Sequence, residues 1–158
     1  MGNYCQGCQY CGKKAIDAVR KNKDELIVVL CPGDEEVKKG YPLASGNPAS
    51  ATQRIISCLP KGKTINDYAV AELVRCNPGR DKKNKYKQPS KTSIQHCSKY
   101  LEELLIEKNY KKIIALNKNA SDIVSKVLSN NPQLNQNLVK GKHPQSGVTN
   151  EELKSYFL

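Results

Sequence analysis

The sequence has no tryptophan, one phenylalanine and one methionine, and aromatic residues make up only 6% of its 158 residues. Large rings can therefore contribute little to packing, and we expect an aliphatic core. No stretch approaches the ~18 consecutive apolar residues of a membrane span, and the N-terminus lacks the apolar core of a signal peptide. These absences predict a cytoplasmic protein without a membrane partner.

Acidic residues are few beside basic ones: 15 Asp and Glu stand against 26 Lys and Arg, which gives a formal net charge of +11. Such an excess attracts polyanions through its long-range field and through counterion release. A lysine-rich composition can also reflect the base composition of a genome, so the charge alone is weak support for a function. We expect nucleic acid, DNA in particular, as the partner of a monomer with a single domain over residues 1–158.

The hydrophobic pattern predicts an alternation of strands and helices. The expected elements are strands at 26–31, 68–75 and 112–116, helices at 49–58, 92–108 and 120–128, and a short helix through Ala15, Ile16 and Val19. Residues 33–48 are rich in Gly and Pro and are expected to form a long, ordered loop. The alternation favours an α/β layered fold with a mainly parallel sheet, in which ligands gather at the carboxyl ends of the strands.

Seven cysteines in a reducing compartment do not suggest a disulfide framework, and clustered cysteines indicate a metal centre. Cys5, Cys8 and Cys11 form two overlapping C-x-x-C units, a spacing that lets thiolates converge on one soft metal centre. Cys76 follows the second strand and Cys97 lies on the next helix, so both could complete such a site. The spacing leaves three alternatives open: a [4Fe–4S] cluster, a structural zinc ion, or reduced thiols without metal.

The remaining two cysteines, Cys31 and Cys58, are expected to be ordinary buried thiols. Cys31-Pro32 could supply the last ligand of a ferredoxin-type motif, but it lies twenty residues beyond Cys11 at a strand end. The spacing of an electron-carrying ferredoxin is therefore not matched.

Seven short motifs follow one another along the chain. They are C-x-x-C, a strand ending in Pro-Gly, an acidic loop with Gly and Pro, a strand running into Cys-x-Pro, a cysteine on a helix, a strand followed by Asn, and His-Pro. They lie at Cys8-x-x-Cys11 or Cys5-x-x-Cys8, residues 29–33, 36–43 and 75–78, Cys97, and residues 114–120 and 143–145. In this order the chain resembles the family-four uracil-DNA glycosylases and their phage DNA-polymerase-related relatives over almost its whole length.

The resemblance implies a three-layer αβα fold of the uracil-DNA glycosylase type, with a central, mainly parallel, four-stranded sheet. It favours a [4Fe–4S] cluster over zinc, with Cys8, Cys11, Cys76 and Cys97 as ligands and Cys5 as the alternative N-terminal ligand. The implied activity is binding of DNA and hydrolysis of the N-glycosidic bond of a flipped base, which is uracil or another altered base.

The resemblance also assigns residues to the site. His143 would donate to the oxygen on which charge grows in the leaving base, and Glu36 would position water or a sugar hydroxyl. The residues alone favour other interpretations: an exposed loop residue for His143, and a solvated helix start or cap for Glu36. The residues expected around the base are Cys31, Pro32, Gly33, Leu43, Glu72 and Asn117. The residues expected on DNA are Arg75, Arg80, Lys82, Lys83, Lys85, Lys87 and Ser146, of which the lysines could also belong to a flexible, solvated loop.

Three positions depart from the family pattern. Leu30 replaces an acidic residue, and Leu43 replaces the aromatic ring that stacks on the base, a contact worth ~1–3 kcal/mol. Glu72 replaces an asparagine, and a carboxylate accepts hydrogen bonds without donating any, so it would repel O4 of uracil. The departures leave a second hypothesis, a catalytically inactive DNA- or nucleotide-binding module of the same fold. A third is a zinc-stabilised nucleic-acid-binding protein of a different fold.

Overall fold

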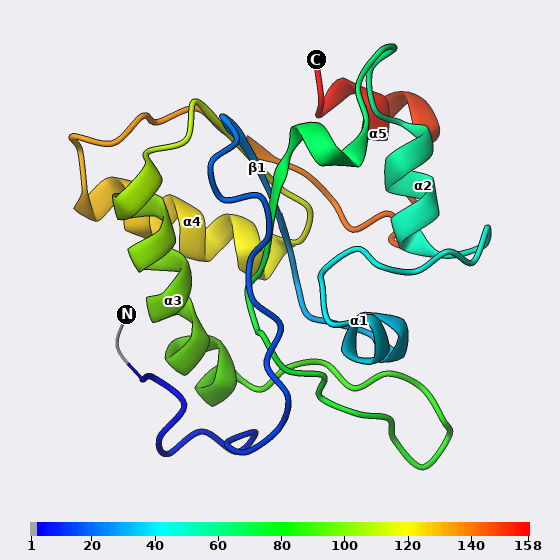
Figure 1. The fold of residues 1–158 in the computed structure, drawn as a ribbon, viewed down its shortest axis with the longest axis vertical. Coiled ribbons are helices and arrows are strands. Elements are labelled where there is room, and N and C mark those ends of the chain that lie inside the picture. Colours follow the sequence, from blue (N-terminus) through cyan, green and yellow to red (C-terminus); the bar gives the residue numbers. More distant parts are fainter. Residues whose placement is uncertain (1–2) are drawn as a thin grey trace.

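A four-stranded sheet forms the centre of the molecule, which the computed structural model describes over residues 3–158. The strand order is β2-β1-β3-β4, and every neighbouring pair is parallel (Figure 1). The strands are β1 (Glu25–Val29), β2 (Ala69–Glu72), β3 (Lys112–Ala115) and β4 (Leu138–Lys140). The prediction of a mainly parallel four-stranded sheet is confirmed.

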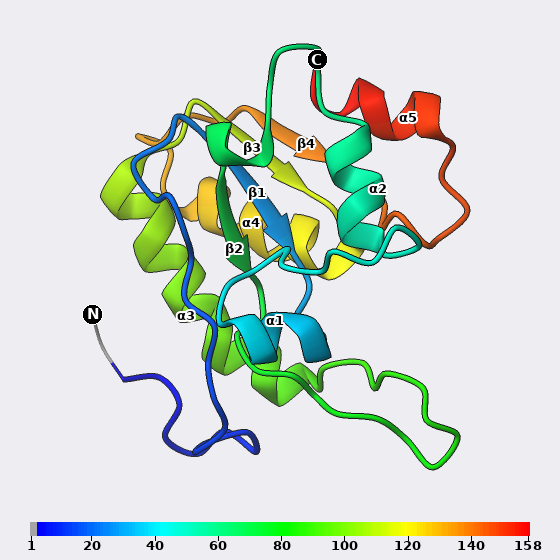
Figure 2. The same ribbon diagram turned by 45° about the vertical axis from the view of Figure 1, so that its right-hand side comes forward.

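Helices cover both faces of this sheet (Figures 1 and 2). One face carries α3 (Lys91–Lys108) and α4 (Lys118–Asn130), and the other carries α2 (Ala51–Ser57) and α5 (Asn150–Ser155). Two further short helices are α1 (Asp34–Lys39), beside the end of β1, and the 3-10 helix η1 (Ile65–Asp67) before β2. The architecture is therefore a three-layer α/β/α arrangement. Among residues 3–158, no helix is both long and apolar enough to cross a bilayer.

The strand sequences are mostly aliphatic because both faces of the sheet are covered. Leu26 and Val28 of β1 belong to a core cluster with the leucines of α3, whereas Ile27 belongs to a second cluster with Ile55 of α2 and Leu153 of α5. The sheet thus separates two apolar cores, and the alternation along β1 divides its side chains between them.

The segment between the cysteines and β1 is extended, so the prediction of a short helix through Ala15, Ile16 and Val19 was wrong. The Ile16 N–H donates to the carbonyl of Arg75 at 2.8 Å, and Val19 forms an antiparallel bridge with Val70. Ile16 is also buried. Pairing with the open edge of β2 satisfies backbone groups that a helix would leave exposed there.

The segment after β1 is not a continuous loop, because α1 begins directly after Gly33. Asp34, Glu35 and Glu36 occupy its first turn, where the partial positive charge of a helix N-terminus favours acidic residues. Gly40 ends the helix with φ at 89°, a left-handed conformation that glycine adopts easily. The prediction for residues 33–48 missed this helix because the turn residues that follow it dominate the composition.

Gly141 lies in a tight contact directly after β4. A Cβ atom there would come within 2.9 Å of Leu116 Cδ2 and of the Tyr156 ring, and the Gly141 N–H donates to the Ala115 carbonyl at 2.8 Å. We expect Gly141→Ala to lower the free energy of unfolding by ~1–3 kcal/mol, because the backbone cannot move away from the added methyl group.

Thermal melts followed by circular dichroism measure this effect. In a chain of this size, the melting temperature falls by about 2–4 °C for each kcal/mol of lost stability. Gly46→Ala is the matched control, since a Cβ there would meet only the end of the flexible Lys39 side chain. Equal melting temperatures for the two variants would contradict the prediction.

Candidate functional site

The ends of all four strands bring predicted site residues to one edge of the sheet. Cys31 follows β1, Glu72 ends β2, Asn117 follows β3 and His143 follows β4. Because the strands are parallel, these residues lie along the carboxyl edge, where open α/β sheets bind their ligands. Four strands at ~4.8 Å spacing spread the residues over about 14 Å.

Two carboxyl groups and a thiol interact beside the ends of β1 and β2, and we call Cys31, Glu36 and Glu72 the acidic cluster. Glu72 is only 5% exposed, Glu36 is partly buried, and Oε2 of each is buried without a hydrogen-bond partner among residues 3–158. Burial raises the pKa of Glu72 well above its usual value, and repulsion from Glu36 adds to this rise. The pair therefore favours a state in which at least one carboxyl group is protonated.

The two carboxyl groups differ in their surroundings. Burial also raises the pKa of Glu36, but hydrogen bonding from the Gly33 backbone opposes the rise. Burial, with the charges of Glu72 and Glu36, raises the pKa of Cys31 to about 12. Cys31 therefore stays a neutral thiol at physiological pH, which suits neither a nucleophile nor a metal ligand.

The basic loop is an ordered hairpin over residues 79–87, which we call the basic hairpin, and it closes over the start of α1. Arg80 and Tyr86 form its antiparallel bridge. Tyr86 Oη accepts a hydrogen bond from the Asp34 N–H at 3.3 Å and lies 3.3 Å from the position that a Cβ on Gly33 would take. The absence of a side chain at Gly33 thus makes room for Tyr86 and anchors the hairpin beside the acidic cluster.

Arg80 has partners within the protein rather than a free guanidinium. It stacks on the Tyr86 ring at 4.0 Å and forms an ion pair with Asp34 at 2.9 Å. The same cation holds the pKa of Asp34 below its usual value. Arg80, which is expected on DNA, therefore also holds the hairpin against α1 together with Tyr86.

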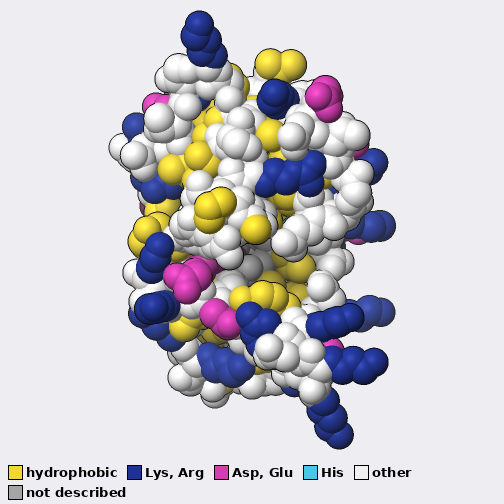
Figure 3. Space-filling view, turned by 90° about the vertical axis from the view of Figure 1, so that its right-hand side faces the viewer, with side chains coloured by type: hydrophobic (Ala, Val, Ile, Leu, Met, Phe, Trp, Pro, Cys, Tyr) yellow, Lys and Arg dark blue, Asp and Glu magenta, His cyan; other side chains and the backbone are white. Residues whose placement is uncertain are grey.

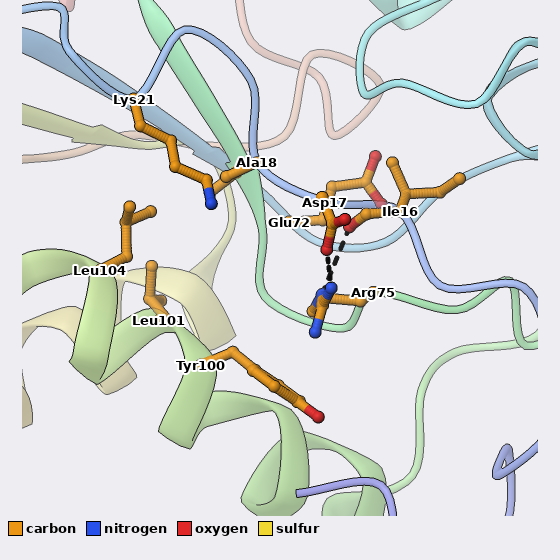
Figure 4. Close-up of a pocket in the computed structure, with 10 residues that line it drawn as sticks. Ile16, Asp17, Ala18, Lys21, Glu72, Arg75, Tyr100, Leu101 and Leu104 are labelled. Carbon is orange, nitrogen blue, oxygen red and sulfur yellow. Dashed lines mark hydrogen bonds and ion pairs between the residues drawn. The ribbon is translucent and has the colours of Figure 1, made fainter. Parts of the chain in front are cut away.

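Arg75 is likewise engaged inside the protein. Its guanidinium lies between Asp17, with which it forms an ion pair, and the Tyr100 ring, on which it stacks at 4.2 Å (Figure 4). Glu72 and Leu101 are among the residues that line a pocket beside it, whose cavity volume of about 30 Å³ has room for water but not for a base.

Four lysines of the basic hairpin, in contrast, are exposed, and none forms an ion pair with a described residue: Lys82, Lys83, Lys85 and Lys87. Figure 3 shows Lys and Arg side chains projecting from the lower part of the molecule, the end at which the hairpin lies in Figures 1 and 2. Ser146, the other predicted DNA contact, is exposed at a turn, where its hydroxyl donates to the carbonyl of His143 at 2.7 Å. These five polar side chains are accessible to a polyanion.

His143 is held in a defined orientation by the turn that follows β4. The backbone N–H of Gln145 donates to His143 Nδ1 at 3.1 Å, and Arg54 of α2 donates to the carbonyls of Pro144 and Val148. Burial lowers the pKa of His143, which favours the neutral ring. Because Nδ1 accepts a hydrogen bond, the proton of the neutral ring lies on Nε2, which is then a donor.

Two residues expected at the base have roles in the folded structure. Asn117 caps α4, since its side-chain oxygen accepts from the N–H groups of Asn119 at 2.8 Å and Ala120 at 3.4 Å. Leu43 packs against the core cluster around Ile27 with φ at 52°, a left-handed conformation that costs a leucine ~1–2 kcal/mol. Pro32 is buried at the end of β1.

The cysteines form a second group, beside the end of β2 and the first half of α3. Cys76 and Cys97 are buried, and each interacts electrostatically with both Cys5 and Cys8. Burial, followed by the charges of the three other thiols, raises the pKa of Cys76 to about 11. Cys11 is exposed. The structure therefore groups Cys76 and Cys97 with Cys5 and Cys8. In this set Cys5, the alternative N-terminal ligand, takes the place of Cys11.

Side chains of α3 hold the loop that carries Cys5. Tyr100 Oη accepts from the Tyr4 N–H at 2.9 Å and lies 3.4 Å from Cys5 Sγ, and His96 Nδ1 lies 2.9 Å from the Tyr4 carbonyl oxygen. The sequence interpretation missed Tyr100 and His96. The signal that could have found Tyr100 is its position three residues after Cys97, which places both on one helix face.

Among residues 3–158, no three His, Cys, Asp or Glu side chains converge closely enough to hold a single metal ion. A tetrahedral zinc ion with bonds of ~2.3 Å would need thiolate sulfurs roughly 3.8 Å apart. The four thiols are neighbours, but they do not form such a compact set.

No protein-family model matches the chain, and no curated protein matches it. The fold and the site define a three-layer α/β protein with a polar site at the carboxyl edge of a parallel sheet, a basic hairpin beside that site, and a group of four cysteine thiols.

Proposed function

We propose that this protein is a DNA glycosylase of the uracil-DNA glycosylase fold, which binds DNA, accepts a flipped base and hydrolyses its N-glycosidic bond. The observation that carries the proposal is the position of Glu36, Glu72 and His143 along one carboxyl edge, next to the basic hairpin. Hydrolysis needs a group that positions water, a group that stabilises charge on the leaving base, and a way to hold the backbone. Each need has a candidate at this edge.

The two catalytic roles follow from the surroundings of the side chains. His143 presents an N–H at Nε2 and can donate to the oxygen of the leaving base as negative charge develops there. Glu36 is less buried than Glu72 and is supported by the Gly33 backbone, so it is the member of the pair that ionises first. An ionised Glu36 can position water, a role that Leu30 cannot perform.

The four exposed lysines of the basic hairpin would hold the DNA backbone. Changing Lys82, Lys83, Lys85 and Lys87 together to Gln should flatten the dependence of DNA affinity on salt, since each phosphate contact contributes roughly 0.7–0.9 to the log–log slope. Fluorescence anisotropy with a labelled oligonucleotide at several salt concentrations measures this slope.

The matched control changes four exposed lysines that lie away from the hairpin: Lys21, Lys61, Lys126 and Lys154. It removes the same net charge, so a long-range field effect would appear in both variants. An equal slope in the two variants would show that the hairpin lysines do not contact phosphates.

We further infer that Cys5, Cys8, Cys76 and Cys97 hold a [4Fe–4S] cluster. The donor set supports this, because it consists of four soft thiols without a carboxylate or an imidazole. Zinc is the alternative, because four thiolates also suit a structural zinc ion. Such a cluster would supply structural cross-linking of the N-terminal loop, the end of β2 and α3, rather than chemistry on the base.

An excision assay with oligonucleotides that carry uracil or other altered bases tests the proposal. Anaerobically purified protein should produce abasic sites in at least the uracil substrate. The second candidate, a catalytically inactive DNA-binding module, is favoured by the inward packing of Leu43 and by Leu30 at the position of the missing acid. Salt-sensitive binding without excision of any base would decide for the module.

A further inference from the structure

Glu72 is a buried acidic side chain with an unpartnered oxygen at a ligand-binding edge. It pairs in register with Val29 at the end of β2, and its neighbours Ala71 and Leu73 belong to the core on the α3 side. The alternation of a strand therefore turns Glu72 to the opposite face, where it interacts with Glu36 of α1. Glu72 is only 5% exposed, and its buried Oε2 has no hydrogen-bond partner among the described residues.

The charged and titratable groups around Glu72 do not stabilise an ionised form. Glu36 from α1 and Cys31 after β1 both interact with it, and both would add negative charge on ionisation. Arg75 lies three residues along the chain, but it is paired with Asp17 and stacked on Tyr100. An ionised carboxylate at this position would therefore be buried beside like charge.

We propose that Glu72 reads the flipped base as a neutral carboxylic acid, donating one hydrogen bond and accepting another. This inference rests on the proposed function and deepens it, since it defines the substrate class: a base whose edge places an acceptor beside an N–H, as O4 and N3–H do in uracil. A neutral acid offers the same pair of functions as an amide, whereas an ionised one only accepts. The glutamate then fits uracil instead of repelling it.

The affinity for uracil should depend on pH, because only the neutral form of Glu72 can donate a hydrogen bond. The neutral form of Glu72 is present at low pH and is lost as pH rises through its raised pKa. The preference for uracil over an abasic site should therefore also fall as pH rises. Glu72→Gln keeps a donor and an acceptor at every pH, so its preference should not change, and Glu72→Ala should have none.

The test uses a single-stranded oligonucleotide with one 2′-fluoro-deoxyuridine, a nucleotide that resists hydrolysis, and a matched strand with a stable abasic analogue. From about pH 6 to about pH 9, we expect the ratio of the two affinities for wild type to fall by ~10-fold or more. Glu72→Gln should keep the ratio measured for wild type at low pH. A wild-type ratio that is constant with pH, or a Gln variant that behaves like the Ala variant, overturns the inference.

Stability supplies a second measurement that does not need DNA. A carboxyl group with a raised pKa in the folded state lowers stability as pH rises, because the unfolded chain releases its proton more readily. Glu72→Gln should therefore melt above wild type by a margin that grows from about pH 5 to about pH 8. The infrared carbonyl band of a protonated acid should be present near neutral pH in wild type and weaker in this variant, and its absence from wild type overturns the inference.

The failure of the inference and the failure of the proposed function have different signatures. If uracil is excised and Glu72→Ala keeps the full uracil preference, the inference fails while the glycosylase proposal stands. If the protein binds free uracil in a calorimetric titration with the expected pH dependence but does not bind DNA, the glycosylase proposal fails while the reading role of Glu72 stands.

Discussion

Cys97→Ser is expected to abolish the visible absorbance of the anaerobically purified protein and to remove a large part of the ~5–15 kcal/mol by which domains are stable. Cys76→Ser should have the same effect. Both thiols are buried beside Cys5 and Cys8, so a cluster bound to the four would join the N-terminal loop to the sheet and to α3. The free energy of metal binding then contributes directly to the free energy of folding. Absorbance spectra and denaturant titrations measure the two effects.

Comparison of Cys5→Ser with Cys11→Ser identifies the N-terminal ligands. We expect Cys5→Ser to lose the chromophore and Cys11→Ser to keep it, because Cys11 is exposed and Cys5 interacts with both buried thiols. Cys31→Ser is a further control and should also stay coloured. The reverse result for Cys5 and Cys11 would restore the ligand set expected from the family resemblance, and a colourless wild type with stoichiometric zinc would contradict the cluster itself.

His143→Ala is expected to lower the single-turnover rate of excision by ~10²-fold or more, with little change in DNA affinity. The Nε2–H of the ring would stabilise charge that develops mainly in the transition state, so its loss raises the barrier without weakening the ground-state complex. Rapid-quench assays with excess enzyme measure the rate, and anisotropy measures the affinity.

Lys142→Ala is the matched control for this variant. Lys142 is the neighbour of His143 in the sequence, but its ammonium forms an ion pair with Glu152 of α5 at 3.2 Å. Its removal should leave the rate of excision near that of wild type. A His143→Ala variant that is as active as Lys142→Ala would exclude His143 from the chemistry.

The fold was largely predictable because its strands are short aliphatic runs and its long helices repeat apolar residues at helical spacing. The strand expected at residues 26–31 overlaps β1 (Glu25–Val29) over four residues, and the helix expected at residues 92–108 almost coincides with α3 (Lys91–Lys108). The failure at Ala15, Ile16 and Val19 has a tertiary cause, since pairing with the edge of β2 outweighs a local helical pattern. Pairing of this kind is not visible in a short window of sequence.

The site was predictable in its location but less so in its details. The parallel topology brings Cys31 and Glu72 to one edge, as the predicted strand ends indicated, and it brings His143 to the same edge through β4, a strand that the hydrophobic pattern did not predict. The sequence could not show that Arg75 is engaged by Asp17 and Tyr100, because these partners come from distant segments. It also treated Glu72 as a charged carboxylate, whereas burial beside Glu36 favours the neutral acid.

Release of free base from DNA tests the central claim most directly. Anaerobically purified wild-type protein is incubated with an oligonucleotide that contains one uracil, and free uracil and abasic sites are quantified by mass spectrometry. The account predicts equal amounts of the two products, formed at a rate that falls ~10²-fold or more in His143→Ala. Tight, salt-sensitive binding of the oligonucleotide without release of uracil would contradict the account.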